Sequence, residues 1–303
     1  MGLVFPLVIA FVCALVATSS ATAGQEAVDQ KTDEQQPPIW KAGQSRSIEL
    51  FPAGEVFPVY AADPHRPSNQ LGIGFYSTTE IPATRSPRWA LSGGGRFGIL
   101  RIDSSAPDGR AWQISIDAGL DAVFDSQNSN DGIGWDGNYG LTMTTGRASS
   151  RFAFKVALLH VSSHLGDEYA ERTQIDRINY TREEIAVAVS FRPRTRLRVY
   201  GELGTAYTMR SDEQQRMRWQ TGGEYERHPT VFGGRMAWYG AVDFSLMEER
   251  DWRLDTCLQG GLVTRNKGRT IRMYVQWYDG RPTLGQFTTY SETAISLGLK
   301  VDL

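Results

Sequence analysis

Residues 152–166 read FAFKVALLHVSSHLG, and this stretch decides which fold the rest of the chain has to support. Successive side chains of a β-strand point to opposite faces of the sheet. The even positions form an apolar face that ends in two histidines and a serine: Phe152, Phe154, Val156, Leu158, His160, Ser162 and His164. The other face carries Arg151 and Lys155 among small residues. The stretch therefore predicts a strand whose more apolar face also carries a base and a hydroxyl group.

Alternation of the same kind recurs from Leu71 onward in about twelve segments. They lie near residues 71–75, 89–99, 112–124, 139–145, 152–164, 185–191, 197–203, 219–226, 238–246, 254–262, 271–277 and 295–303. An even number of strands, with short turns at one end and longer loops at the other, is typical of bacterial membrane barrels. We therefore predict an all-β protein, a transmembrane antiparallel up-and-down β-barrel of about 12 strands.

The alternation alone does not say which face points inward, and a secreted soluble β-sandwich alternates equally well. Two features favour a barrel with its apolar face outward. The polar face is rich in Gly, Ala, Ser and Tyr, which suits a narrow, filled interior. Tryptophan and tyrosine lie near strand ends, as interfacial girdles require. The mean hydropathy of −0.36 excludes a helical membrane bundle but suits a barrel, whose strands are only half apolar.

The sequence divides into three parts. Residues 1–23 contain an apolar run followed by the small residues Ala21-Thr22-Ala23, which predicts a cleaved signal peptide. Residues 24–68 are polar and then rich in proline, which predicts a partly disordered periplasmic lead-in, packed under or into the barrel. Residues 69–303 are the predicted outer-membrane barrel. The expected location is therefore the bacterial outer membrane, reached through export.

Charge and cysteine content narrow the function classes. The net charge is −2, so bulk electrostatics favours no nucleic-acid partner. After the signal peptide Cys257 is the only cysteine, so an intramolecular disulfide is excluded. An exported chain without disulfides needs another source of stability, and a closed sheet supplies one. The expected partners are outer-membrane lipids, either phospholipid or lipopolysaccharide.

His160 and Ser162 lie two residues apart, so their side chains are neighbours on one face of the predicted strand. At this spacing an imidazole nitrogen can take the proton of a hydroxyl during attack on an ester. In one register with the next strand, Glu183 lies opposite His160. A register shifted by two residues brings Asn179 opposite Ser162 instead, and either residue is a candidate for orienting the histidine. The alternative is that His160 and Ser162 are ordinary polar residues at a strand end near the lipid headgroups. Polar residues on a lipid-facing surface are energetically costly, however, which favours a functional role.

An acidic segment follows directly, with Asp167 and Glu168 at its start. Carboxylates are the ligands that hard cations such as Ca²⁺ prefer, and a bound Ca²⁺ could bridge lipopolysaccharide phosphates. The same composition is also ordinary for a solvated loop. Asp167 and Glu168 are the candidate metal ligands, and Ca²⁺ is the one cofactor considered.

The run HVSSHLGDEY at residues 160–169 resembles the hallmark of a bacterial family known as domain of unknown function 1207. The run RINYTREE at 177–184 and the lead-in at 50–67 fit the same family. The resemblance covers most of the mature chain, and it implies no particular activity.

The lipid-facing His-x-Ser also resembles that of the outer-membrane phospholipase A and lipid A deacylase barrels. This looser resemblance implies a catalytic base at His160, a nucleophile at Ser162 and an orienting residue at Asn179 or Glu183. Phospholipase A of this kind is twelve-stranded and uses calcium at a dimer interface, so the resemblance admits a homodimer. The sequence departs from those enzymes after the serine, where Ser163-His164 stands, and Gln174 occupies the usual spacing of the third member.

Three hypotheses follow. The first is an outer-membrane acyl-ester hydrolase that acts on phospholipid or lipid A. The second is a non-catalytic barrel, either a narrow pore or a structural component of the membrane. The third is the soluble sandwich, which would place Phe154, Val156 and Leu158 in a central hydrophobic core.

Overall fold

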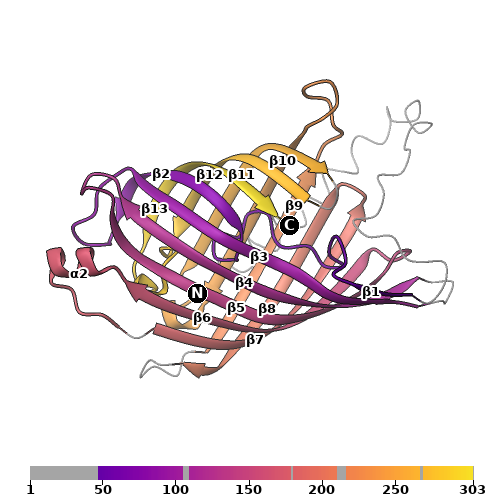
Figure 1. The fold of residues 1–303 in the computed structure, drawn as a ribbon, viewed down its shortest axis with the longest axis horizontal. Coiled ribbons are helices and arrows are strands. Elements are labelled where there is room, and N and C mark those ends of the chain that lie inside the picture. The colour runs from indigo at the N-terminus through magenta and orange to yellow at the C-terminus, as the bar shows by residue number, and fades with distance from the viewer. Residues whose placement is uncertain (1–46, 105–108, 179, 210–215, 267–268, 303) are drawn as a thin grey trace. The chain divides into compact units, whose positions relative to one another are not determined.

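The computed structural model describes residues 47–104, 109–178, 180–209, 216–266 and 269–302. One antiparallel sheet of 13 strands closes on itself through the pairing of β3 with β4 (Figure 1). The strands are β1 (Ser47–Leu50), β2 (Asn69–Thr79), β3 (Arg88–Asp103), β4 (Arg110–Asp125), β5 (Asp131–Arg147), β6 (Phe152–Leu165), β7 (Tyr180–Arg194), β8 (Leu197–Met209), β9 (Met217–Glu226), β10 (Ala237–Met247), β11 (Leu254–Asn266), β12 (Arg269–Gly280) and β13 (Glu292–Asp302). Strands β2 to β13 form a twelve-stranded up-and-down barrel, which confirms the predicted fold class.

Strand β1 is an addition that the sequence did not predict. It pairs with Leu100–Asp103, because β3 continues well past the start of β2 and leaves that part of its edge open. Ile48 and Leu50 are exposed and extend the apolar outer surface. The helices among the described residues are short, and none has the length and apolar character of a membrane span.

The two faces of the sheet differ as the alternation predicted. On β6, Phe154, Val156 and Leu158 are 52%, 44% and 46% exposed, whereas Lys155 between them is 3% exposed. The apolar face therefore points out of the barrel and the charged face into it. This arrangement excludes the soluble sandwich and is the surface of a barrel that sits in lipid.

Most of residues 52–68 lies inside the barrel, and we call this segment the lumenal plug. Phe57 and Tyr60 are buried against the inner wall, and the Tyr60 hydroxyl donates to Glu202 Oε2 at 2.8 Å. Arg198 donates to two plug carbonyls, 2.7 Å to Pro58 and 3.1 Å to Val59. The predicted signal peptide and residues 24–46 lie outside the described residues.

Two glycines of the wall make room for the plug. A Cβ atom on Gly98 would lie 2.8 Å from Pro52 Cγ, and one on Gly119 would lie 2.7 Å from Pro67 Cβ. Both distances are too short for carbon atoms in contact, so any larger side chain there would push the proline away. The sequence of the wall is therefore matched to an occupied lumen.

Ion pairs join the plug to the wall. Glu202 pairs with Lys155, Arg218 and the plug residue Arg66, and Arg218 also pairs with Glu184. Further buried pairs of the wall are Arg88–Glu292, Arg96–Asp117 and Arg272–Asp302. Buried charges are costly unless they are paired, so this network satisfies the charged inner face. A cavity of about 80 Å³ remains in the lumen.

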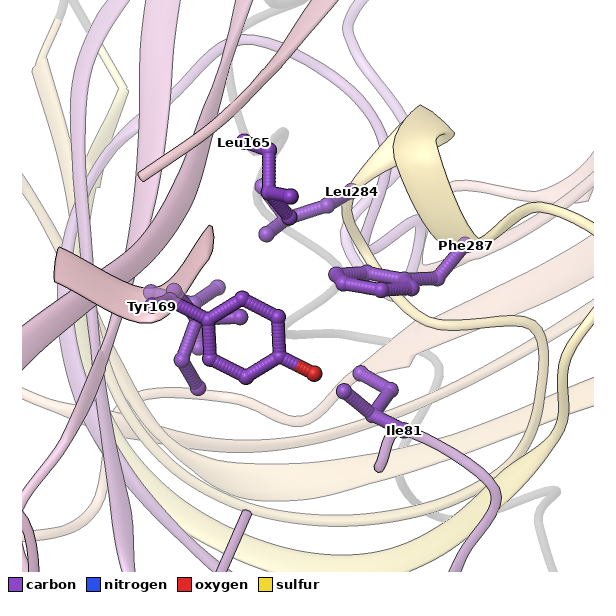
Figure 2. Packing of buried hydrophobic residues seen from close by; sticks show 7 residues of the cluster. Ile81, Leu165, Tyr169, Leu284 and Phe287 are labelled. Carbon is purple, nitrogen blue, oxygen red and sulfur yellow. The ribbon is translucent and has the colours of Figure 1, made fainter. Parts of the chain in front are cut away.

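The loop end of the barrel is covered by a small hydrophobic cluster. Ile81, Leu165, Tyr169, Leu284 and Phe287 come together from the loops after β2, β6 and β12 (Figure 2). Tyr169 belongs to the seven-residue helix α2 (Asp167–Thr173).

Hydrogen bonds hold the β12–β13 loop in this cover. Asp136 Oδ2 accepts from the Gly285 amide at 2.8 Å, and Ser163 Oγ accepts from the Gln286 amide at 2.8 Å. The Ser163 hydroxyl in turn donates to Asp136. The lumen is thus occupied by the plug and covered at the loop end.

Candidate functional site

The paired strands β6 and β7 bring the predicted base and acid together. The register places His160 opposite Glu183 and Ser162 opposite Thr181, which is the first of the two registers considered from the sequence. His160 Nδ1 lies 2.5 Å from Glu183 Oε1. Both side chains are on the outer face near the loop end, with His160 13% and Glu183 29% exposed.

Aromatic rings flank this pair. Tyr139 of β5 stacks on His160, with the ring centroids 4.1 Å apart and the planes 19° apart. The Tyr207 hydroxyl of β8 donates to Glu183 Oε2 at 3.3 Å. The stacking limits rotation of the imidazole, and the two hydrogen bonds hold both carboxylate oxygens.

Ser162 lies between two stacked pairs of rings. Trp135 stacks on His164 with the centroids 4.0 Å apart, so ring pairs stand on either side of Ser162 along the strands. Opposite Ser162 on β5 is Gly137, which has no side chain to fill the space. We call this gap the Gly137 notch. Ser162 itself is partly exposed on this face.

The pair and the serine share the outer face of β6 and β7 near the loop end of the barrel. In the described part of the chain, His160 is hydrogen-bonded to Glu183, and no hydrogen bond joins it to Ser162. A bond through Nδ1 leaves Nε2 as the nitrogen for a hydroxyl. Hydrogen bonds between a nucleophile and its base are often long before substrate binds. A histidine without a hydrogen bond to the serine is therefore compatible with a role as its base.

The remaining predicted residues are placed as follows. Asn179 lies outside the described residues, so its role stays a prediction. Asp167 pairs with Arg177, and Glu168 is exposed in the first turn of α2. The described residues contain no group of three or more side chains that would hold a metal ion, and the Ca²⁺ site stays a prediction.

Sequence reasoning missed three members of the site: Tyr139, Tyr207 and Gly137. Tyr139 and Gly137 share the outward parity of Leu141 and Met143, so the register of β5 with β6 would have found them. Tyr207 shares the outward parity of Leu203 and Thr205, so extending the regular β7–β8 register to the loop end would have placed it beside Glu183.

Comparison with known proteins gives a family and a set of similar folds. The model of a family described as "Protein of unknown function (DUF1207)" matches residues 15–302. No curated protein matches the sequence.

Solved structures with a similar fold share little sequence with this chain. Outer membrane phospholipase A from Escherichia coli is 12% identical, with a TM-score of 0.48 over 78% of this chain and 92% of that one. A NanC porin is 12% identical, with a TM-score of 0.40 over 77% and 99% of the two chains. At these values the likeness says nothing about activity. The membrane assignment rests on the apolar outer face of the barrel itself.

Proposed function

Because this chain belongs to the DUF1207 family of proteins of unknown function, its activity has to come from its own site, and we propose that it is an outer-membrane acyl-ester hydrolase. The observation that carries the proposal is the hydrogen bond between His160 Nδ1 and Glu183 Oε1 on the lipid-facing side of the barrel. A carboxylate that holds an imidazole in lipid is costly to maintain, and next to a serine hydroxyl it forms the base half of a triad.

Each residue then has one role. The Glu183 carboxylate accepts a hydrogen bond from Nδ1–H of His160 and stabilises the imidazolium form. Nε2 takes the proton of Ser162 as its Oγ attacks the acyl carbonyl, and returns that proton to the departing alcohol. Water repeats the sequence on the acyl-enzyme and releases the fatty acid, so the enzyme is restored.

The substrate class follows from the position of the site. His160 and Ser162 lie on the outer face near the loop end of β6, where the barrel meets the interfacial region of a membrane. Ester carbonyls of phospholipid and lipid A lie at this depth. A lipid can therefore reach Ser162 by lateral diffusion through the Gly137 notch, without entering the lumen.

The test compares acyl release from mixed lipid–detergent micelles by purified wild type, Ser162→Ala and His160→Ala. His164→Ala is the matched control, because His164 is also a stacked outward imidazole on β6 but does not contact Glu183. Loss of activity in the first two variants and its retention in the control support the proposal. Equal acyl release in all four proteins would refute it.

The filled lumen favours a second candidate, a structural barrel without catalytic activity. The plug and the cover of the loop end argue against the narrow pore, since they occupy the path that ions would take. Absence of conductance in planar bilayers together with absence of Ser162-dependent acyl release would select this candidate.

A further inference from the structure

The two ends of the barrel differ sharply in charge. The turn segments 104–110, 147–151, 192–196, 226–236 and 265–269 hold ten arginines and one carboxylate, Glu226, among their described residues. The loop segments at the other end, 80–87, 126–130, 166–179, 210–216, 248–253 and 281–291, hold seven arginines and eight carboxylates among theirs. The excess of positive charge is therefore confined to the turn end.

We define the arginine rim as the arginines of the five turn segments, and several of them have no ion pair among the described residues. Glu226 pairs with Arg265. The other carboxylates close to this end pair with arginines of the wall: Glu49 with Arg101, Glu224 with Arg198 and Asp302 with Arg272. Arg151, Arg227, Arg235 and Arg269 are exposed and have no ion pair among the described residues.

The rim lies just beyond a girdle of exposed rings. Arg151 directly precedes Phe152, and the Arg227 amide donates to the carbonyl of Trp238 at 2.8 Å. Phe152 and Trp238 are exposed on the outer face. Aromatic girdles mark the membrane–water interface, and one residue of strand advances roughly 3.3 Å. From these positions, next to the interface, the guanidinium groups can reach lipid phosphates.

We infer that the turn end of the barrel binds the anionic headgroups of phospholipids in the leaflet that surrounds it. Arginine presents a planar set of donors that matches phosphate oxygens, and its aliphatic stem can extend along the apolar wall. The rim follows all five turns around the barrel, as an annulus of lipid does. An acidic protein partner would instead be expected to match a patch on one side.

The test uses the quenching of tryptophan fluorescence by brominated lipids in vesicles at low salt. Wild type is expected to bind brominated phosphatidylglycerol about three to ten times more strongly than brominated phosphatidylcholine. The variant R151Q/R227Q/R269Q should bring this ratio close to one, and high salt should do the same to wild type. The matched control R85Q/R216Q/R253Q removes three exposed arginines from the loop end and should keep the preference.

Heat-modifiable migration in gels confirms that each variant is folded, since these side chains are exposed and their loss should not affect closure of the barrel. A preference that survives in the turn variant, or falls equally in both variants, overturns the inference. A wild-type barrel without any preference would leave the arginine rim to a soluble acidic partner and would overturn it as well. The outcome is independent of acyl release, because the rim and the His160 site lie at opposite ends of β6.

Discussion

Tyr60 of the lumenal plug stacks on Tyr200 of the barrel wall, with the ring centroids 3.8 Å apart and the planes 9° apart. The guanidinium group of Arg198 lies 5.3 Å from both ring centroids. Ring stacking and the cation–π contact each stabilise the pair beyond the contribution of the buried apolar area. This contact joins the lead-in to the centre of the sheet and explains why the plug stays in a charged lumen.

Replacement of Arg198 by alanine should loosen the plug, because it removes two hydrogen bonds to plug carbonyls and the cation above the two rings. Loss of hydrogen bonds from a charged donor costs roughly 1.5–3 kcal/mol each. We expect transient conductance of this variant in planar bilayers, and no conductance of the wild type. Arg272→Ala is the control, since Arg272 is a buried wall arginine that pairs with Asp302 instead of the plug. Equal behaviour of the two variants would contradict the assigned role.

A second prediction concerns the pH dependence of the plug. Burial raises the pKa of Glu55 to about 7, and its carboxylate oxygens accept from Ser115 Oγ at 3.1 Å. This pKa lies above the value of 4.5 expected in the unfolded chain, so the protonated Glu55 side chain stabilises the folded plug. That stabilisation is fully present below pH 4.5 and is lost as the pH rises through about 7.

Hydrogen exchange of residues 55–66, corrected for intrinsic rates, should therefore be faster at pH 8.5 than at pH 6. Glu55→Gln should remove most of this difference, whereas Glu171→Gln on the exposed surface of α2 should not. A wild-type plug with the same protection at both pH values would show that Glu55 does not titrate there.

Much of this architecture could be predicted from local patterns. The alternation of Phe154 and Lys155 separated the two faces of the sheet, because the period of a strand is fixed by backbone geometry. The small residues of the polar face and the aromatic residues near strand ends then predicted which face points outward. The pairing of His160 with Glu183 was one of the two registers that the parity of the strands allowed, and the structure has this one.

What could not be predicted depends on contacts without a local pattern. The plug is held by individual contacts, such as the hydrogen bond from Arg198 to the Pro58 carbonyl. A proline-rich irregular segment has no sequence pattern that predicts such contacts. The register shift that places Thr208 opposite Glu183 has no signal in the sequence, and β1 forms only because β3 extends beyond the start of β2.

A third prediction isolates the role of Glu183. Glu183→Gln keeps a hydrogen-bond acceptor beside His160 but removes the charge that stabilises the imidazolium form. We expect kcat to fall roughly 10³-fold, with the pH–rate profile displaced, by analogy with amide substitution of a triad acid. Tyr207→Phe removes one partner of the carboxylate and should lower kcat only about threefold. If Glu183→Gln left the rate and the pH profile unchanged, the Glu183 carboxylate would have only a structural role.

The fourth prediction concerns access to Ser162. A Cβ atom on Gly137 would lie 3.3 Å from Ser162 Oγ and 3.7 Å from Trp135 Cζ3, so it fits only if neighbours yield slightly. Gly137→Ala should therefore lower kcat/KM for a lipid ester by roughly tenfold, and Gly137→Val should abolish turnover, because the notch is filled.

Gly201→Ala is the matched control for this change. Gly201 also lies at an outward position of a strand, but a Cβ atom there meets nothing within 4 Å. Both variants expose one added methyl group to lipid, so a shared loss of activity would reflect folding and not access. If Gly137→Val kept full activity while Ser162→Ala lost it, the ester would have to approach Ser162 from the β7 side, past Thr181.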